Sequence, residues 1–321
     1  MSNKEIYKAT LTFSLHRVLY DIGAFVLLLA FGAIGFWGAQ SLADAGLAGL
    51  LLGLIIGFIF FAVILRYVSY TYKAGQIAMM TRAVTEGALP DNVLSEGKKA
   101  VKERFVTVAL FYAATRAIRA VFNELGRMLS RVGRAVGGKN GESVADVISA
   151  VVSVVVAYLC DCCLGWIFFR RNENAARAAC EGAVIFFKNW KVLAKNMGRV
   201  FGFGLSSLLV IGGIFTGIFY GIASFFPDFF TALAEELAES GDLESGGEFL
   251  TDPAMLMLFC AVLCAVVIWS ILHSVFIRPL VLTGVLRNYL KAGIEDMPTE
   301  ESFALLDEKS KQFRKLHSTV S

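Results

Sequence analysis

Three charged side chains lie within otherwise apolar segments of this chain: Arg116, Arg119 and Asp161. A charge at bilayer depth costs at least about 2.5 to 3.5 kcal/mol on insertion scales, so such groups often serve ion or substrate pathways. In two antiparallel helices, which rise about 1.5 Å per residue, Arg116 and Asp161 would reach similar depths. We therefore expect Asp161 to pair with Arg116 or Arg119. The pair either belongs to a functional site or only fixes the register of the helices.

Two stripes of glycine recur at intervals of four residues. They are Gly49, Gly53 and Gly57 in one segment, and Gly213, Gly217 and Gly221 in another. Glycine removes side chains from one helix face, which lets a second helix approach closely within a membrane. We interpret both stripes as helix-packing surfaces, with the lining of a pore or ligand groove as the alternative.

Motifs of catalysis or metal binding are missing from the sequence. There is no Walker loop, no HExxH, no pair of Cys-x-x-Cys motifs and no G-x-S-x-G. The run from Cys160 to Cys163 has no His beside it, and adjacent helical residues point in different directions. We expect no enzyme activity, no cofactor and no metal.

Five segments of twenty or more residues carry almost no charge. An α-helix of about 20 apolar residues crosses the bilayer core of roughly 30 Å, so each segment is long enough to span. They are Ile22–Ala43, Ala45–Leu65, Val147–Phe169, Val200–Pro227 and Pro253–Ile277. A composition of 56% hydrophobic and 18% charged residues agrees. We predict an all-α, multi-pass transmembrane helical bundle.

Lys and Arg orient such a chain, because short loops rich in them stay in the cytoplasm. Basic blocks run from Arg66 to Arg104 and from Arg170 to Arg199. Placing both inside requires an even number of crossings between them, and Val147–Phe169 supplies one. We expect Phe105–Gly126 to supply another. The alternative is an amphipathic helix on the membrane surface over Phe105–Val136.

This layout has about six spans and cytoplasmic amphipathic helices, with both termini in the cytoplasm of a plasma or bacterial inner membrane. The loop containing Lys139 and the acidic segment Asp228–Asp252 would then both be external. The basic helices on the inner side, including Asn172–Arg199, could hold anionic lipid. A net charge of +3 gives no reason to expect a nucleic-acid partner.

A weak internal repeat is visible in the sequence. Phe13–Leu19 resembles Phe187–Leu193, and Tyr72–Pro90 resembles Phe276–Pro298. We therefore divide the single membrane domain into a first helix-and-hairpin unit, a middle pair of spans, a second helix-and-hairpin unit and a polar cytoplasmic tail. These sections are residues 1–104, 105–171, 172–298 and 299–321. Such repeats occur in transporters, with the binding site between the halves, and also in proteins that transport nothing.

Three pieces of the second half resemble choline-transporter-like membrane proteins. The first is Cys163–Trp166, the second is Arg171–Ala176 with Gly182 and Lys191–Val200, and the third is Val275–Leu280 with Leu290–Asp296, in the order found in the C-terminal half of that family. The same region is similar to uncharacterised bacterial integral membrane proteins. The resemblance implies a transporter-like protein for a small solute such as a cation, although no residues of a choline cage can be assigned. A non-transporting scaffold or lipid-interacting protein is the alternative.

Overall fold

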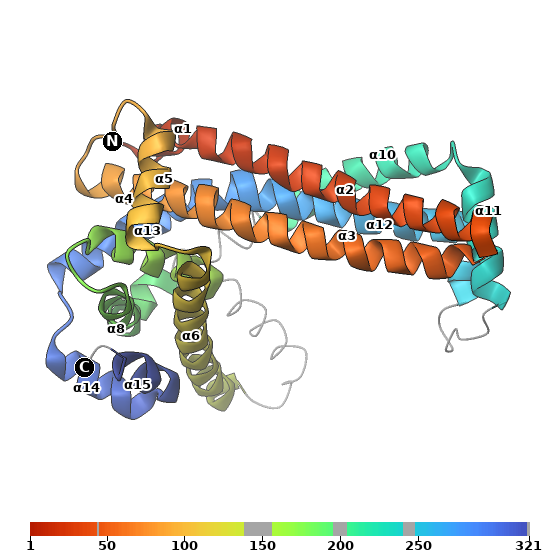
Figure 1. Cartoon of the computed structure of the whole chain (residues 1–321). Coiled ribbons are helices and arrows are strands. Elements are labelled where there is room, and N and C mark those ends of the chain that lie inside the picture. Colours follow the sequence, from red (N-terminus) through yellow and green to blue (C-terminus); the bar gives the residue numbers. More distant parts are fainter. Residues whose placement is uncertain (44, 138–155, 195–203, 240–247, 320–321) are drawn as a thin grey trace. The chain divides into compact units, whose positions relative to one another are not determined.

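The computed structural model describes residues 1–43, 45–137, 156–194, 204–239 and 248–319, and every regular element within them is a helix (Figure 1). The all-α prediction is therefore confirmed for this part of the chain. The chain forms two compact units. Unit 1 combines Met1–Ser14, Ser69–Phe201 and Arg278–Ser321, and unit 2 combines Leu15–Val68 and Gly202–Ile277.

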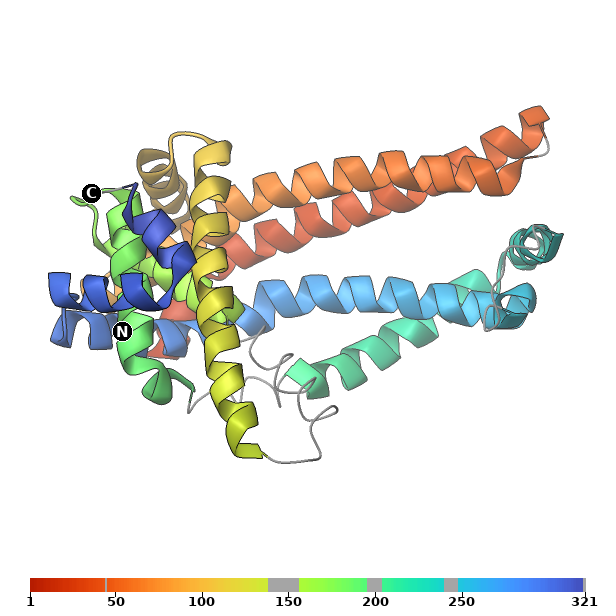
Figure 2. The ribbon, with the colours of Figure 1, turned by 90° about the horizontal axis from the view of Figure 1, so that it is seen from below.

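Unit 2 consists mainly of two helical hairpins, which Figure 2 shows along their length. In the first, α2 (Leu11–Ala43, which begins in unit 1) turns into α3 (Gly46–Val68). The second contains a π-helical segment η2 (Leu208–Gly212), α10 (Gly213–Ala223), α11 (Pro227–Glu239), a short 3₁₀ helix η3 (Glu248–Thr251), α12 (Pro253–Leu272) and a second π-helical segment η4 (His273–Ile277).

Four helical stretches are long and apolar enough to span a membrane: Leu11–Leu42, Gly46–Thr85, Gly204–Ala223 and Pro253–Glu295. A fifth would exist only if Val93–Arg104 and Ala109–Glu124, which meet at 79°, formed one broken span. The chain is thus a multi-pass membrane protein, but the count of six spans is not confirmed. Residues 147–155 of the predicted fourth span and Lys139 lie outside the described ranges.

Apolar side chains cover the outside of unit 2. On α3 only four glycines and Val68 are buried, whereas Leu52 and Phe58 are each 60% exposed. The two hairpins meet through small clusters, one of which contains Phe25, Ile268 and Val275. Exposure of this kind suits a surface that faces hydrocarbon, because lipid tails are as apolar as the side chains themselves.

The first glycine stripe forms the close contact between α2 and α3. A Cβ atom on Gly49 would overlap the carbonyl oxygen of Gly35, and one on Gly53 would overlap that of Phe31. The second stripe differs, because a Cβ atom on Gly213, Gly217 or Gly221 would have no neighbour within 4 Å. Our packing interpretation is therefore wrong for the second stripe among the residues described, since that face of α10 has no helix against it.

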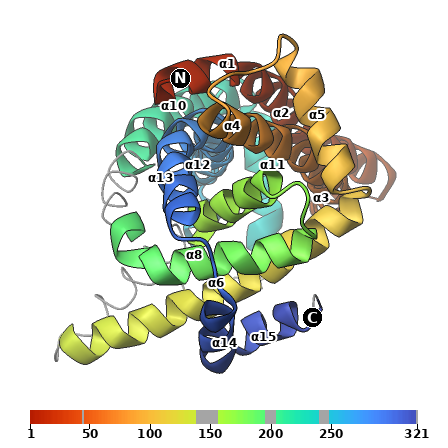
Figure 3. The same ribbon diagram turned by 90° about the vertical axis from the view of Figure 1, so that its left-hand side faces the viewer.

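Unit 1 is a separate helical assembly. Figure 3 shows α4, α8 and α13 around a short apolar helix, Val156–Phe169. Trp166 of that helix and Tyr289 of α13 are fully buried. Besides Val156–Phe169, the helices of this unit are α1 (Asn3–Ala9), π-helical η1 (Ser69–Lys73), α4 (Ala74–Thr85), α5 (Val93–Arg104), α6 (Val108–Gly137), α8 (Ala175–Ala194), α13 (Arg278–Glu295), α14 (Glu300–Lys309) and α15 (Lys311–His317).

The second helix of each hairpin continues into unit 1 without a loop. The segment η1 joins α3 to α4, and η4 joins α12 to α13, so the continuous stretches reach 40 and 43 residues. Only about 20 residues are needed to cross the hydrocarbon core. Each stretch is thus long enough to serve both as a span and as a core helix of unit 1.

Candidate functional site

Asp161 forms a buried ion cluster with two cations, Lys73 and Arg278, which lie far from it in the sequence. Its carboxylate oxygens lie 2.7 Å from Nζ of Lys73 and 2.6 Å from a guanidinium nitrogen of Arg278. The side chain of Asp161 is only 7% exposed. Lys73 is the last residue of η1 and Arg278 is the first of α13. The cluster therefore joins both hairpin exits to the helix Val156–Phe169.

The predicted pairing of Asp161 with Arg116 or Arg119 is wrong. Both arginines are exposed on α6. The opposite face of that helix buries Ile118 and Phe122, and the Phe122 ring lies 5.3 Å from that of Phe186 on α8. Because α6 is amphipathic, the stripe that contains Ile118 and Phe122 packs into unit 1, and Arg116 and Arg119 face outward.

The electrostatics of the cluster favour an ionised carboxylate. Burial raises the pKa of Asp161, but the positive charges of Arg278 and Lys73 outweigh burial and hold that pKa below its ordinary value. Arg278 also donates a 2.9 Å hydrogen bond to the carbonyl oxygen of Ala157 and lies 5.3 Å from the ring centre of Tyr158. Because the pKa of Asp161 is lowered, the stabilisation by its ionised carboxylate is present at neutral pH and is lost only as the pH falls through that lowered pKa. The cluster is therefore suited to act as a structural clamp that holds η1 and α13 against the helix Val156–Phe169.

A second polar cluster lies within unit 2. Arg17 of α2 donates hydrogen bonds of 3.0 Å to both the carbonyl oxygen and Oγ of Ser274 in η4. Asp21, one helical turn after Arg17, lies 3.6 Å from the guanidinium. Both charged side chains are at most 10% exposed. The i, i+4 spacing of opposite charges just before the first apolar segment was a sequence signal for this cluster.

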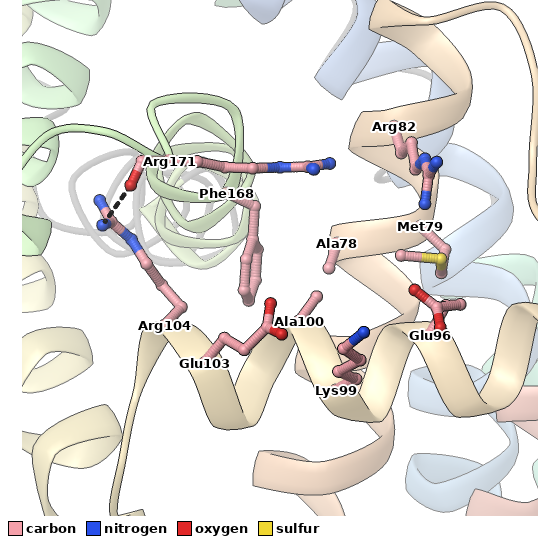
Figure 4. Close-up of a pocket in the computed structure, with 10 residues that line it drawn as sticks. All are labelled: Ala78, Met79, Arg82, Glu96, Lys99, Ala100, Glu103, Arg104, Phe168 and Arg171. Carbon is pink, nitrogen blue, oxygen red and sulfur yellow. Dashed lines mark hydrogen bonds between the residues drawn. The ribbon is translucent and has the colours of Figure 1, made fainter.

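A pocket of about 340 Å³ opens between α4, α5 and the end of the helix Val156–Phe169 (Figure 4). Ala78, Met79 and Phe168 are buried and form its apolar part. The other lining residues are Arg82, Glu96, Lys99, Ala100, Glu103, Arg104 and Arg171. All of these except Ala100 are polar, and none was identified as a site from the sequence, because on the sequence alone they belong to two ordinary solvated basic blocks.

Arg104 has a structural role at the edge of this pocket. Its guanidinium donates to the carbonyl oxygens of Arg170, Arg171 and Glu173 at 3.1, 3.3 and 2.6 Å. These carbonyls follow the helix Val156–Phe169, where backbone acceptors lack helical partners. The guanidinium is thereby fixed, and fewer of its donors remain for a ligand.

Two adjacent cysteines of the helix Val156–Phe169 lie in its buried part. All six thiols are free, and Cys162 and Cys163 are fully buried. Burial raises the pKa of both thiols well above the ordinary value. Because the thiolate is the nucleophile and the metal ligand, these side chains suit packing.

The class of the molecule, a multi-pass helical membrane protein, is defined by its own helices. No protein-family model, curated protein or solved structure matches the chain. The resemblance to choline-transporter-like proteins and to bacterial integral membrane proteins therefore stays a prediction.

Proposed function

We propose that the chain is a four-span, lipid-interacting membrane scaffold whose unit 1 segments lie on the cytoplasmic side. The observation that carries this proposal is the distribution of positive charge. All 30 Lys and Arg residues lie within residues 1–17, 66–199 and 278–321. The intervening residues, 18–65 and 200–277, contain acidic side chains but no Lys or Arg. A positive-inside arrangement follows if only the two hairpins cross the membrane.

Four spans also satisfy the parity requirement that suggested six. The two basic blocks need an even number of crossings between them. If only the two hairpins cross the membrane, there is no crossing between the blocks, and both lie on the same side. The helix Val156–Phe169 and α6 can then belong to unit 1, where Trp166 and Phe122 are fully buried. The loop containing Lys139 moves to the cytoplasmic side, with the other basic residues. Both termini are cytoplasmic in this proposal.

Transport is the weaker proposal because the apolar runs of the hairpins contain almost no charge. Within Ile22–Leu65, 204–223 and 253–277, the only charged residue is Asp44, at the tip of the first hairpin. A transporter for a cation generally binds it near the bilayer midplane with polar or charged groups. The charged residues of the two clusters, Arg17, Asp21, Lys73, Asp161 and Arg278, all lie outside these apolar runs. We therefore favour a scaffold that contacts anionic lipid through its basic residues.

The repeat of helical hairpins is part of the same proposal. In each half an apolar helix leads through a π-helical segment into a helix of unit 1, namely α3–η1–α4 and α12–η4–α13. These junctions fall at the start of the similar segments Tyr72–Pro90 and Phe276–Pro298. The correspondence supports a duplication of the hairpin together with its cytoplasmic extension.

Labelling of cysteines at two positions tests the span count. We expect Lys139→Cys and Glu239→Cys to react with a membrane-impermeant maleimide from opposite sides of sealed vesicles of known orientation. Four spans place residue 139 inside and residue 239 outside, whereas six place both outside. The unsubstituted protein, with its six native thiols, measures background labelling. Labelling of both positions from one side would refute the four-span arrangement.

Stability in nanodiscs tests the scaffold function. We expect the Tm to be higher with anionic than with zwitterionic lipid, because Lys and Arg near the surface each gain about 1 kcal/mol from an anionic leaflet. The difference should shrink as salt rises, since exposed charges are screened. Quaternary amines and amino acids should leave the Tm unchanged. A rise in Tm with one of those solutes, without any dependence on lipid charge, would favour transport instead.

A further inference from the structure

We propose that the pocket between α4 and α5 binds a small organic anion, in which a phosphate or carboxylate is attached to an apolar body. Its volume of about 340 Å³ lies within the range of small-molecule sites. A second hollow of about 340 Å³ adjoins it and shares Ala78, Arg82, Phe168 and Arg171. The proposed site thus extends along α4 and is independent of the number of membrane spans.

The position of Glu86 indicates where the anionic group of the ligand would lie. Its carboxylate lies 2.7 Å from Nε of Arg82 and 3.3 Å from a terminal guanidinium nitrogen of Arg171. Two guanidiniums from different elements therefore converge on one oxyanion of this chain. Planar guanidinium groups match the oxygen geometry of both carboxylate and phosphate. Glu86 occupies the place that the oxyanion of a ligand would take.

Displacement of Glu86 needs little energy. The side chains of Glu86 and Arg171 are 45% and 60% exposed. Exposed ion pairs contribute only about 0 to 1 kcal/mol each. A ligand that brings its own oxyanion and buries apolar area can therefore replace the glutamate, and Glu86 acts as an internal competitor.

The orientation of the ligand follows from the rest of the lining. Figure 4 shows Arg171 extending toward the side of Arg82, with Glu96 and Glu103 on α5. Lys99 lies three residues after Glu96 and four before Glu103, so its charge is largely compensated on its own helix. With Arg104 included, the charges of α5 that line the pocket cancel, so a second anionic group on the ligand would gain no net attraction there. The body of the ligand is therefore uncharged and lies against the buried side chains Phe168 and Met79.

Titration of the full-length protein with phenyl phosphate tests this assignment. We expect saturable binding, measured calorimetrically in detergent micelles, and much weaker binding of inorganic phosphate, which lacks the apolar body. Arg82→Gln and Arg171→Gln should each weaken binding about tenfold or more, because a hydrogen bond to a charged group contributes about 1.5 to 3 kcal/mol. Glu86→Gln should strengthen binding several-fold by removing the competitor. Both arginine variants should fold, since every side chain in the pairs that they lose is at least 30% exposed.

Lys291→Gln serves as the matched control, because Lys291 is 71% exposed and lies outside the pocket. It removes one positive charge and should leave the affinity unchanged. Absence of phenyl phosphate binding, or binding that neither arginine substitution weakens, would overturn the proposal. Equal affinities for inorganic and phenyl phosphate would overturn the apolar part of the site. Weaker binding in Glu86→Gln would show that the glutamate is not a competitor.

Discussion

Replacement of Asp161 by Asn is expected to lower the free energy of unfolding by about 3 kcal/mol, because it leaves two cations without their shared partner. Lys73 and Arg278 are 24% and 22% exposed, so solvent screens part of the loss and the lower end of the range for buried pairs applies. Equilibrium unfolding in detergent micelles measures the change. The effect should be largest at neutral pH, where the carboxylate of the native protein is ionised.

Two further variants separate the ion cluster from other effects of the substitution. Asp228→Asn makes the same chemical change at an exposed position and should alter stability by less than about 0.5 kcal/mol. Combining Asp161→Asn with Lys73→Met and Arg278→Met removes all three charges and should recover much of the loss, since buried ion clusters can often be replaced by apolar side chains. A stable Asp161→Asn protein would show that the cluster is not the clamp proposed here.

Replacement of Gly53 by Ala should destabilise the first hairpin by about 1 to 3 kcal/mol, the usual effect of overpacking. The added Cβ atom would overlap the backbone carbonyl of Phe31, and a backbone group cannot rotate away as a flexible side chain can. Relief of the overlap requires α2 and α3 to separate. Thermal unfolding of the purified variant in micelles should show a lower Tm.

Gly217→Ala is the matched control from the second glycine stripe. Its Cβ atom would have no neighbour within 4 Å, so we expect stability equal to or slightly above that of the parent protein. Alanine is also the better helix former, by about 1 kcal/mol in water. Equal destabilisation by both substitutions would contradict the contrast between the two stripes.

Four of the predicted spans are helices long and apolar enough to cross a membrane, and there is a physical reason why the sequence identified them. Hydropathy identified the helices of both hairpins, because a helix surrounded by lipid must be apolar on every face. The segment Val147–Phe169 has the same property over its described part, but there protein supplies the apolar surroundings, with Trp166 and Ile167 fully buried. A helix buried in a protein core and a helix in lipid share one hydropathy pattern. The sequence could not separate them.

The candidate site was predicted only in part. Asp161 was recognised because a carboxylate in an apolar run must have partners. Those partners, Lys73 and Arg278, are distant in sequence, and local periodicity does not report such pairing. One signal was present: each follows the second apolar segment of a hairpin, at nearly the same place in the predicted repeat. The pocket left no such signal, because its arginines and glutamates resemble solvated helix faces.

The discontinuity of unit 1 has a consequence for the order in which the protein is made. Its three stretches are separated by residues 15–68 and 202–277, so both hairpins must leave the ribosome before Arg278–Glu295 is available to complete the core. Chains emerge at about 5 to 20 residues per second, which leaves α4 and Val156–Phe169 without α13 for several seconds. Asp161 has only one of its two cations until then. The second hairpin is therefore synthesised completely before the core of unit 1 can be completed.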